Sequence, residues 1–161
     1  TRKHGGEYTA SAVGEVNVVA QMKRVNAVIG GEGNGGVIYP ACHSGRDALV
    51  GVALFLSYMA KSKKSCSAIR AQYPAYFISK NKIELQPSMN VKHILDSIAE
   101  NYKQYEVNRI DGVKIDFDNG WVHLRTSNTE PIIRIYAEAG TEEQADHLAQ
   151  KIMLDIREAM K

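Results

Sequence analysis

The chain has 161 residues, of which 44% are hydrophobic, and its 20 basic and 18 acidic residues leave a formal net charge of +2. This length and apolar content support one compact domain or two small ones, and the interspersed charges exclude a large basic field for nucleic acid or membrane. The sequence contains neither an apolar run long enough to cross a membrane nor a secretory leader. Cys42 and Cys66 have no metal-binding or disulfide spacing, so we expect a cytoplasmic protein.

The first half of the chain alternates short extended segments with helices. Apolar residues at helical spacing predict an amphipathic helix whose apolar stripe faces a core. A second, longer apolar helix is expected with Asp47 in its first turn, and Ser65 can cap a third, short helix. The expected elements are, in order, a strand at 7–13, a helix at 15–26, strands at 27–29 and 37–39, and helices at 47–61 and 66–72.

The pattern changes at Tyr73–Pro74, where we place a boundary between a domain at 1–73 and a domain at 74–161. An Asn-Gly turn between two apolar alternations predicts a hairpin, and Thr141 begins a capping box for the last helix. The second domain therefore has the predicted order β-α-β-β-β-α. Its expected elements are an extended segment at 76–85, a helix at 91–102, strands at 110–117, 120–124 and 132–137, and a helix after 141.

A glycine-rich loop, Gly31-Glu32-Gly33-Asn34-Gly35-Gly36, separates two of the expected strands. Its letters match a dinucleotide-binding fingerprint, but a strand follows it where that fingerprint needs a helix, and Glu32 would repel a phosphate. A carboxylate and an amide on a loop of glycines can instead hydrogen-bond sugar hydroxyls at close range. The local chemistry equally allows an ordinary glycine-rich hairpin with Glu32 in water.

A polar turn, Arg125-Thr126-Ser127-Asn128-Thr129-Glu130-Pro131, joins the last two expected strands. Its guanidinium, hydroxyl, amide and backbone N–H donors can converge on one phosphate dianion. The alternative is a hairpin turn capped by Ser127 and Thr129, with Arg125 in a surface ion pair.

These two loops, in this order, resemble the sugar-specificity and C-terminal phosphate loops of the α-D-phosphohexomutases. The resemblance extends over essentially the whole chain, including Gly45-Arg46-Asp47 and Ile110-Asp111-Gly112-Val113. It is closest to the phosphoglucosamine mutase and phosphomannomutase branches, where a G-G-E-x-N-G-G form occurs. The resemblance implies sugar-binding positions at Glu32, Gly33, Asn34 and Gly35, and phosphate-binding positions at Arg125, Ser127, Asn128 and Thr129. Glu15 and His43 receive no role.

Two motifs of that family are missing. Thr9-Ala10-Ser11 begins like the phosphoserine loop T-A-S-H-N-P but does not continue as that loop does, so Ser11 is a decoy. No aspartate cluster resembles the magnesium loop D-G-D-x-D-R. The resemblance therefore implies the C-terminal part of a longer mutase, with a truncated mixed α/β third domain followed by an α+β C-terminal domain of antiparallel sheet and two helices. The first residues, which lack an initiator methionine, also suggest a fragment.

By resemblance, the parent enzyme interconverts hexose 6-phosphate and hexose 1-phosphate through a phosphoserine and a bisphosphorylated sugar. Its Mg²⁺ would be bound outside this chain, which would hold no metal and no catalytic residue and would be inactive alone. The expected partners are a hexose phosphate and the missing N-terminal domains, with neither nucleic acid nor membrane. The alternatives are a non-catalytic phosphosugar-binding module and a small nucleic-acid-binding domain that uses Lys114, Arg125 and Arg134.

Overall fold

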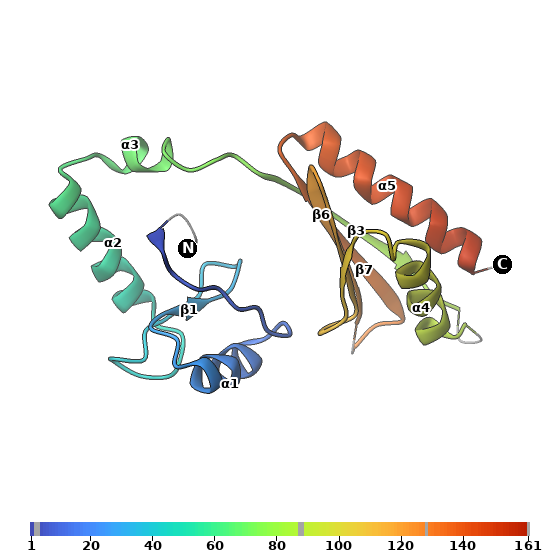
Figure 1. Ribbon diagram of the computed structural model, residues 1–161, viewed down its shortest axis with the longest axis horizontal. Helices are drawn as coiled ribbons and strands as arrows, with labels where there is room; N and C mark the ends of the chain where they lie inside the picture. The colour runs from blue at the N-terminus through green and yellow to red at the C-terminus, as the bar shows by residue number, and fades with distance from the viewer. Residues whose placement is uncertain (2–3, 87–88, 128, 161) are drawn as a thin grey trace. The chain divides into compact units, whose positions relative to one another are not determined.

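The computed structural model describes residue 1 and residues 4–86, 89–127 and 129–160. The chain divides into two compact units, Thr1–Tyr73 and Pro74–Lys161. Figure 1 traces the elements of each unit along the chain. The second unit contains a five-stranded sheet, whereas the only sheet in the described part of the first unit is a pair of two-residue strands.

The second unit is an antiparallel sheet in the order β3-β7-β6-β5-β4, with two helices packed on it (Figure 1). Helix α5 contacts β3, β6 and β7, and α4 contacts both β5 and α5. The elements are β3 (Phe77–Glu84), α4 (Val91–Asn101), β4 (Glu106–Asn108), β5 (Val113–Phe117), β6 (Gly120–Thr126), β7 (Ile132–Ala139) and α5 (Glu142–Ala159). This result confirms the predicted α+β domain, with one strand more than the sequence indicated.

The core of this unit forms because its strands alternate. In β7, Ile133, Ile135, Ala137 and Ala139 are almost fully buried, and the residues between them are partly exposed. A period of two places successive side chains on opposite sheet faces, so one face of β7 is apolar. Helix α5 covers that face with the buried residues Ala145, Leu148, Ala149, Ile152 and Ile156.

Tyr102 ties α4 to α5 because its hydroxyl donates a hydrogen bond to the carboxylate of Asp155, while its ring packs edge-on against Phe117. Only 4% of Tyr102 is exposed. Burial, and then the hydrogen bond and charge of Asp155, raise the pKa of Tyr102 above its ordinary value of 10.0. This contribution to stability is complete below pH 10 and declines as the pH rises above that value, because the unfolded tyrosine then ionises first.

We expect Tyr102→Phe to lower the free energy of unfolding at neutral pH by about 1–2 kcal/mol. The variant should also lose less stability than the parent chain between neutral pH and about pH 11, because it lacks the shifted phenol. Urea unfolding followed by the fluorescence of Trp121, the single tryptophan, measures both effects. Tyr105→Phe is the matched control, since Tyr105 lies in the same aromatic cluster. If the free energy of unfolding depends on pH in the same way in the parent chain and in both variants, Tyr102 does not have the raised pKa.

The first unit has a much smaller core. Among its described residues, Met22, Ile38 and Ile69 are the buried hydrophobic side chains. Helix α2 is the most apolar element, yet none of its residues is buried, and Leu49 is 82% exposed. The elements are α1 (Glu15–Val25), β1 (Gly30–Gly31), β2 (Val37–Ile38), α2 (Ala48–Ser62) and α3 (Cys66–Arg70).

Three local expectations for the first unit are wrong. Residues 7–13 form no strand, because no described segment pairs with their backbone, and an unpaired strand has no stabilising hydrogen bonds. The strand expected at 27–29 lies at Gly30–Gly31, where the chain pairs with Val37–Ile38. The apolar stripe of α1 is mostly exposed, with Val16 at 81%, and contributes only Met22 to the core.

Candidate functional site

The glycine-rich loop turns between β1 and β2, which pair through Gly30 with Ile38 and Gly31 with Val37. Within the loop, the N–H of Glu32 donates to the carbonyl of Gly36 at 3.1 Å, and the N–H of Gly35 donates to the carbonyl of Glu32 at 3.1 Å. Gly35 has a φ of +92°, which favours glycine. A Cβ on Gly31 would overlap the carbonyl oxygen of Gly36. These glycines therefore close a tight hairpin that a chain with side chains at 31 and 35 could not form without strain.

The side chain of Glu32 is only 15% exposed and is therefore not the solvated loop residue of the alternative interpretation. Its Oε2 lies 3.7 Å from Nη1 of Arg46, which belongs to the segment before α2. At this distance the two groups form an ion pair rather than a direct hydrogen bond. Glu32 thus retains lone pairs that can accept hydrogen bonds from a ligand.

Asn34 and Gly33 occupy the tip of the loop. The Oδ1 of Asn34 accepts a hydrogen bond from the N–H of Gly36 at 3.0 Å, which fixes the side-chain amide. Its NH₂ group has no hydrogen-bond partner among the residues that the structure describes, so it can donate to a ligand. A Cβ on Gly33 would meet nothing within 4 Å, and the backbone is open to close approach at this point.

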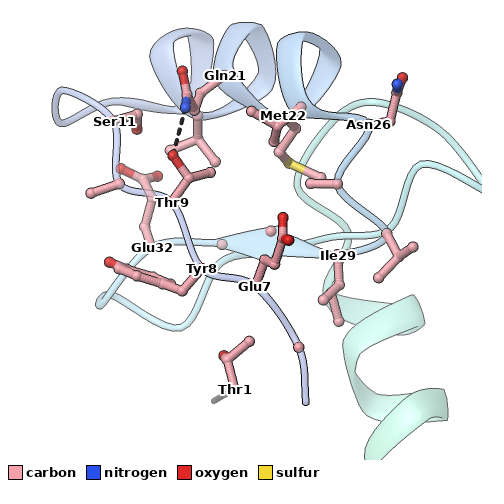
Figure 2. A pocket seen from close by; sticks show the side chains of 18 of the residues that line it. Thr1, Glu7, Tyr8, Thr9, Ser11, Gln21, Met22, Asn26, Ile29 and Glu32 are labelled. Carbon is pink, nitrogen blue, oxygen red and sulfur yellow. Dashed lines mark hydrogen bonds between the residues drawn. The ribbon is translucent and has the colours of Figure 1, made fainter. Parts of the chain in front are cut away.

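A pocket of about 670 Å³ borders the glycine loop within the first unit (Figure 2). Its wall includes Glu32, Thr9, Ser11 and Gln21, together with apolar groups such as Met22. The dashed line in Figure 2 marks the hydrogen bond from Nε2 of Gln21 to Oγ1 of Thr9, at 2.6 Å. The hydroxyl of Ser11 donates to the neighbouring carbonyl of Ala12 at 2.9 Å.

Glu15 and His43, which received no role from the sequence, lie beside the start of α2. Both carboxylate oxygens of Glu15 accept hydrogen bonds from Arg46, one from its backbone N–H and one from Nε. The hydrogen bond from the backbone N–H of Arg46 is the largest cause of the lowered pKa of Glu15. The Nε2 of His43 lies 3.0 Å from Oδ2 of Asp47. Asp47 is the N-cap of α2 and not a first-turn residue. The backbone N–H of Val50 donates a hydrogen bond to the carboxylate of Asp47, and this bond is the main cause of the lowered pKa of Asp47.

The polar turn of the second unit lies between β6 and β7. The N–H of Ser127 donates to the carbonyl of Ile132 at 3.1 Å, which continues the strand pairing into the turn. The N–H of Thr129 and the hydroxyl of Thr129 each lie 3.4 Å from Oγ of Ser127. Ser127 and Thr129 thus lie close together, and Asn128 lies outside the described residues.

Arg125 stands on β6 at the entrance of this turn, with 29% of its side chain exposed. Its Nη1 lies 3.5 Å from Oδ2 of Asp111. The ring N–H of His123 donates to the carbonyl of Asp111, with Nε2 and O separated by 2.6 Å. Gly112 follows with a φ of +69°, and its backbone packs against that of Leu124. The Asp111–Gly112 turn therefore holds the carboxylate behind the guanidinium of Arg125.

The strand register places three cations in one row beside the turn. Arg125 is directly opposite Arg134, and Arg134 is directly opposite Lys82 of β3. Like charges that face each other across strands are destabilising unless they are neutralised. Asp111 partly neutralises Arg125, and Glu130 lies 3.3 Å from Arg134. Two of the three cations therefore have a carboxylate partner.

The described residues were also compared with what a metal site and a membrane-spanning helix require. Within the described ranges, no group of three or more His, Cys, Asp or Glu side chains is arranged to hold a metal ion. In the same residues, no helix combines the length and the apolar character that a bilayer crossing requires.

Sequence reasoning missed Arg46, Asp111 and His123 as neighbours of the candidate loops. Arg46 and Asp111 were noted only within segments that resemble the family, Gly45-Arg46-Asp47 and Ile110-Asp111-Gly112-Val113. The signal for Asp111 and Gly112 was the Asp-Gly pair before a strand, which is typical of a tight turn. Nothing local indicated that Arg46 contacts Glu15, which is 31 residues away in the sequence.

Comparison with known protein families gives two adjacent matches. Residues 1–76 match the model of phosphoglucomutase/phosphomannomutase, alpha/beta/alpha domain III, and residues 82–154 match the model of the C-terminal domain of the same family.

Curated relatives agree with these matches. The chain is 37% identical over 162 residues to a phosphoglucomutase/phosphomannomutase of Thermococcus kodakarensis, covering 99% of this chain and 35% of the relative. It is 32% identical to a probable phosphoglucosamine mutase of Methanopyrus kandleri (99% and 36% covered) and 37% identical to a phosphoglucosamine/phosphogalactosamine mutase of Sulfurisphaera tokodaii (87% and 31%). The chain spans about a third of the length of these relatives.

Solved structures show the same fold. A phosphoglucomutase/phosphomannomutase family protein from Burkholderia thailandensis superposes with a TM-score of 0.73 at 25% identity, over 99% of this chain and 33% of that one. The N-acetylphosphoglucosamine mutase of Aspergillus fumigatus, in complex with glucose 1,6-bisphosphate, superposes with a TM-score of 0.61 at 16% identity, over 95% and 34%. The second likeness concerns the fold alone.

Proposed function

Because the chain belongs to the phosphoglucomutase/phosphomannomutase family and carries its domain III and C-terminal domain, we propose that it is the substrate-binding part of a hexose phosphate mutase. The whole protein would interconvert hexose 6-phosphate and hexose 1-phosphate through a phosphoserine and a bisphosphorylated sugar. We propose glucosamine phosphate as its substrate, with mannose or glucose phosphate as the alternatives. The relatives named phosphoglucosamine mutase support this order.

The observation that carries the proposal is the polar turn beside the row formed by Arg125, Arg134 and Lys82. A hexose phosphate that presents either end to the reactive centre needs a fixed site for its other phosphate. We propose that Arg125, Ser127, Asn128 and Thr129 form that site, with Arg125 as the charged fork. The positive row of Arg125, Arg134 and Lys82 supports the choice of a dianion as ligand.

The glycine loop would bind the sugar. Glu32 accepts hydrogen bonds from hydroxyl groups, and Asn34 donates through its amide. Gly33 and Gly35 let the ring approach the backbone, and the open space at Gly33 supports this role. These groups orient the substrate and do not themselves break bonds, so their contribution to the rate comes from positioning.

We propose that the natural protein is longer and that its other domains supply the phosphoserine and the Mg²⁺ site. The exposed apolar face of α2 supports the presence of further structure against the first unit. The whole protein would act in the cytoplasm, where this chain alone would be inactive.

We expect Glu32→Gln in the longer protein to lower kcat/KM by roughly tenfold to a hundredfold, or about 1.5–3 kcal/mol, because a charge-assisted hydrogen bond to a hydroxyl is lost. The measurement is conversion of glucosamine 6-phosphate and mannose 6-phosphate to their 1-phosphates. Glu143→Gln, which removes an exposed carboxylate in the first turn of α5, is the control. Native turnover by Glu32→Gln would make Glu32 a structural residue of the loop.

A non-catalytic phosphosugar-binding module is the second candidate. The two differ in size, because a four-domain enzyme needs several hundred residues. The mass of the natural protein in cells therefore separates them. A natural chain of the present length that binds a hexose phosphate without converting it would favour the module.

A further inference from the structure

Arg46 has its backbone fixed beside the strand that leaves the glycine loop. It forms an antiparallel bridge with Ile38 of β2, and the next N–H, that of Asp47, donates to the carbonyl of Val37 at 2.9 Å. Asp47 then caps α2. A residue held by a strand on one side and a helix cap on the other has little backbone freedom. The direction in which the Arg46 side chain leaves the backbone is therefore set by the fold.

Glu15, the first residue of α1, fixes the guanidinium itself. Its Oε1 accepts from the backbone N–H of Arg46 at 2.8 Å, and its Oε2 accepts from Nε at 2.8 Å. The first contact fixes the backbone of Arg46, and the second restrains the position of its guanidinium group. Because Glu15 occupies Nε, the Nη atoms are left for other contacts.

The Nη1 side of Arg46 reaches Glu32, whose Oε2 lies 3.7 Å away. The Cγ and Cδ atoms of the Arg46 side chain lie close to Gly36. A Cβ on Gly36 would lie 2.7 Å from Cδ of Arg46 and 3.2 Å from Oδ1 of Asn34. The loop can close on the arginine stem only because residue 36 has no side chain. Arg46 therefore contacts the loop both at its last glycine and at its carboxylate.

We propose that Arg46 is a positioning residue of the sugar loop, held by Glu15 and in turn orienting Glu32 toward the hydroxyl groups of a hexose phosphate. This inference rests on the proposed function of Glu32. Arg46 acts through Glu32 by holding its carboxylate in one direction, so that ligand hydroxyls meet preset acceptors. Glu15 anchors this arrangement by holding Arg46 and has no contact with the ligand in this proposal.

The test is an NMR titration of the ¹⁵N-labelled 161-residue chain with glucose 6-phosphate and, separately, with inorganic phosphate. In the parent chain, glucose 6-phosphate should shift the amides of Gly33 and Gly35, and both ligands should shift Ser127 and Thr129. We expect Glu15→Gln and Arg46→Gln each to weaken the response at Gly33 and Gly35 by roughly tenfold. Their response at Ser127 to inorganic phosphate should be unchanged, and the amide dispersion of the first unit should match that of the parent chain, which a loss of folding of that unit could not produce.

Three further variants separate positioning from charge and from packing. The double variant Glu15→Gln/Arg46→Gln should lose no more than either single variant, because both act through one guanidinium. Glu15→Asp, which keeps the carboxylate, should recover part of the response. Arg70→Gln, which changes another arginine of the same unit, is the matched control.

The outcomes distinguish the two proposals. If glucose 6-phosphate leaves Gly33 and Gly35 unmoved in the parent chain, the proposed role of the sugar loop fails. If it moves them equally in the parent, in Glu15→Gln and in Arg46→Gln, the loop role stands and the inference about Arg46 is overturned. If Arg46→Gln loses its folded spectrum, Glu15→Gln alone decides.

Discussion

Replacing Arg125 by lysine should weaken phosphate binding by about tenfold or more, which corresponds to at least about 1.4 kcal/mol. Lysine keeps the positive charge but cannot make the planar, two-point contact of a guanidinium with a dianion. The carboxylate of Asp111, 3.5 Å from Nη1, restrains the guanidinium of Arg125. The ammonium group of a lysine, at the end of a flexible side chain, would not be held in one orientation in this way.

The measurement is a titration of the chain with inorganic phosphate in low salt, following the amides of Ser127 and Thr129. Arg109→Lys is the matched control, because Arg109 lies in the same unit and is paired with Asp96 of α4. Unphosphorylated glucose should leave both amides unmoved. Equal shifts in Arg125→Lys and the parent chain would reduce the site to nonspecific positive charge, and an absence of shifts in the parent would leave only a structural turn.

Gly112→Ala should destabilise the second unit by on the order of 2–4 kcal/mol. Gly112 has a φ of +69°, and a Cβ there would overlap the carbonyl oxygen of Leu124. Leu124 cannot move away easily, because β6 is paired on both sides, with Val113 of β5 and Ile135 of β7. The turn that carries Asp111 would be displaced, so phosphate binding at Arg125 should weaken in the same variant.

Urea unfolding followed by Trp121 fluorescence measures this change, because Trp121 belongs to β6 and hydrogen-bonds Glu138 of β7. Gly140→Ala is the matched control in the same unit. A Cβ on Gly140 would meet only Oε1 of Gln144 at 3.5 Å, an ordinary contact with a flexible side chain. If the two alanine variants unfold at the same urea concentration, the Asp111–Gly112 turn does not depend on glycine.

The second unit was largely predictable because its signals are local. The β-branched and aromatic run at 132–137 indicates a strand, and Thr141 three residues before Gln144 indicates a helix start. The fold class and the family are confirmed. The short strand β4 was missed because Glu106–Asn108 has no apolar alternation of its own and becomes a strand only by pairing with β5.

The first unit was less predictable because, as for β4, its strands depend on pairing with other segments. Residues 7–13 have the composition of a strand, but a strand needs a partner, and none of the described segments supplies one. Helix α2 was predicted from its apolar run, although Asp47 proved to be its N-cap and not a first-turn residue. The exposure of its apolar surface was not predictable. Burial depends on what packs against an element and not on the element's own pattern.

The sequence by itself determined most of the elements of regular structure, the two loops and the family, because periodicity, caps and motifs depend on residues close together in the chain. The roles of Glu32, Asn34, Arg125, Ser127, Asn128 and Thr129 remain predictions. Only the tertiary structure placed Glu15 on Arg46, Arg46 on Glu32, and Asp111 behind Arg125. Such contacts join residues 14 to 31 positions apart, and strand register and helix packing decide them.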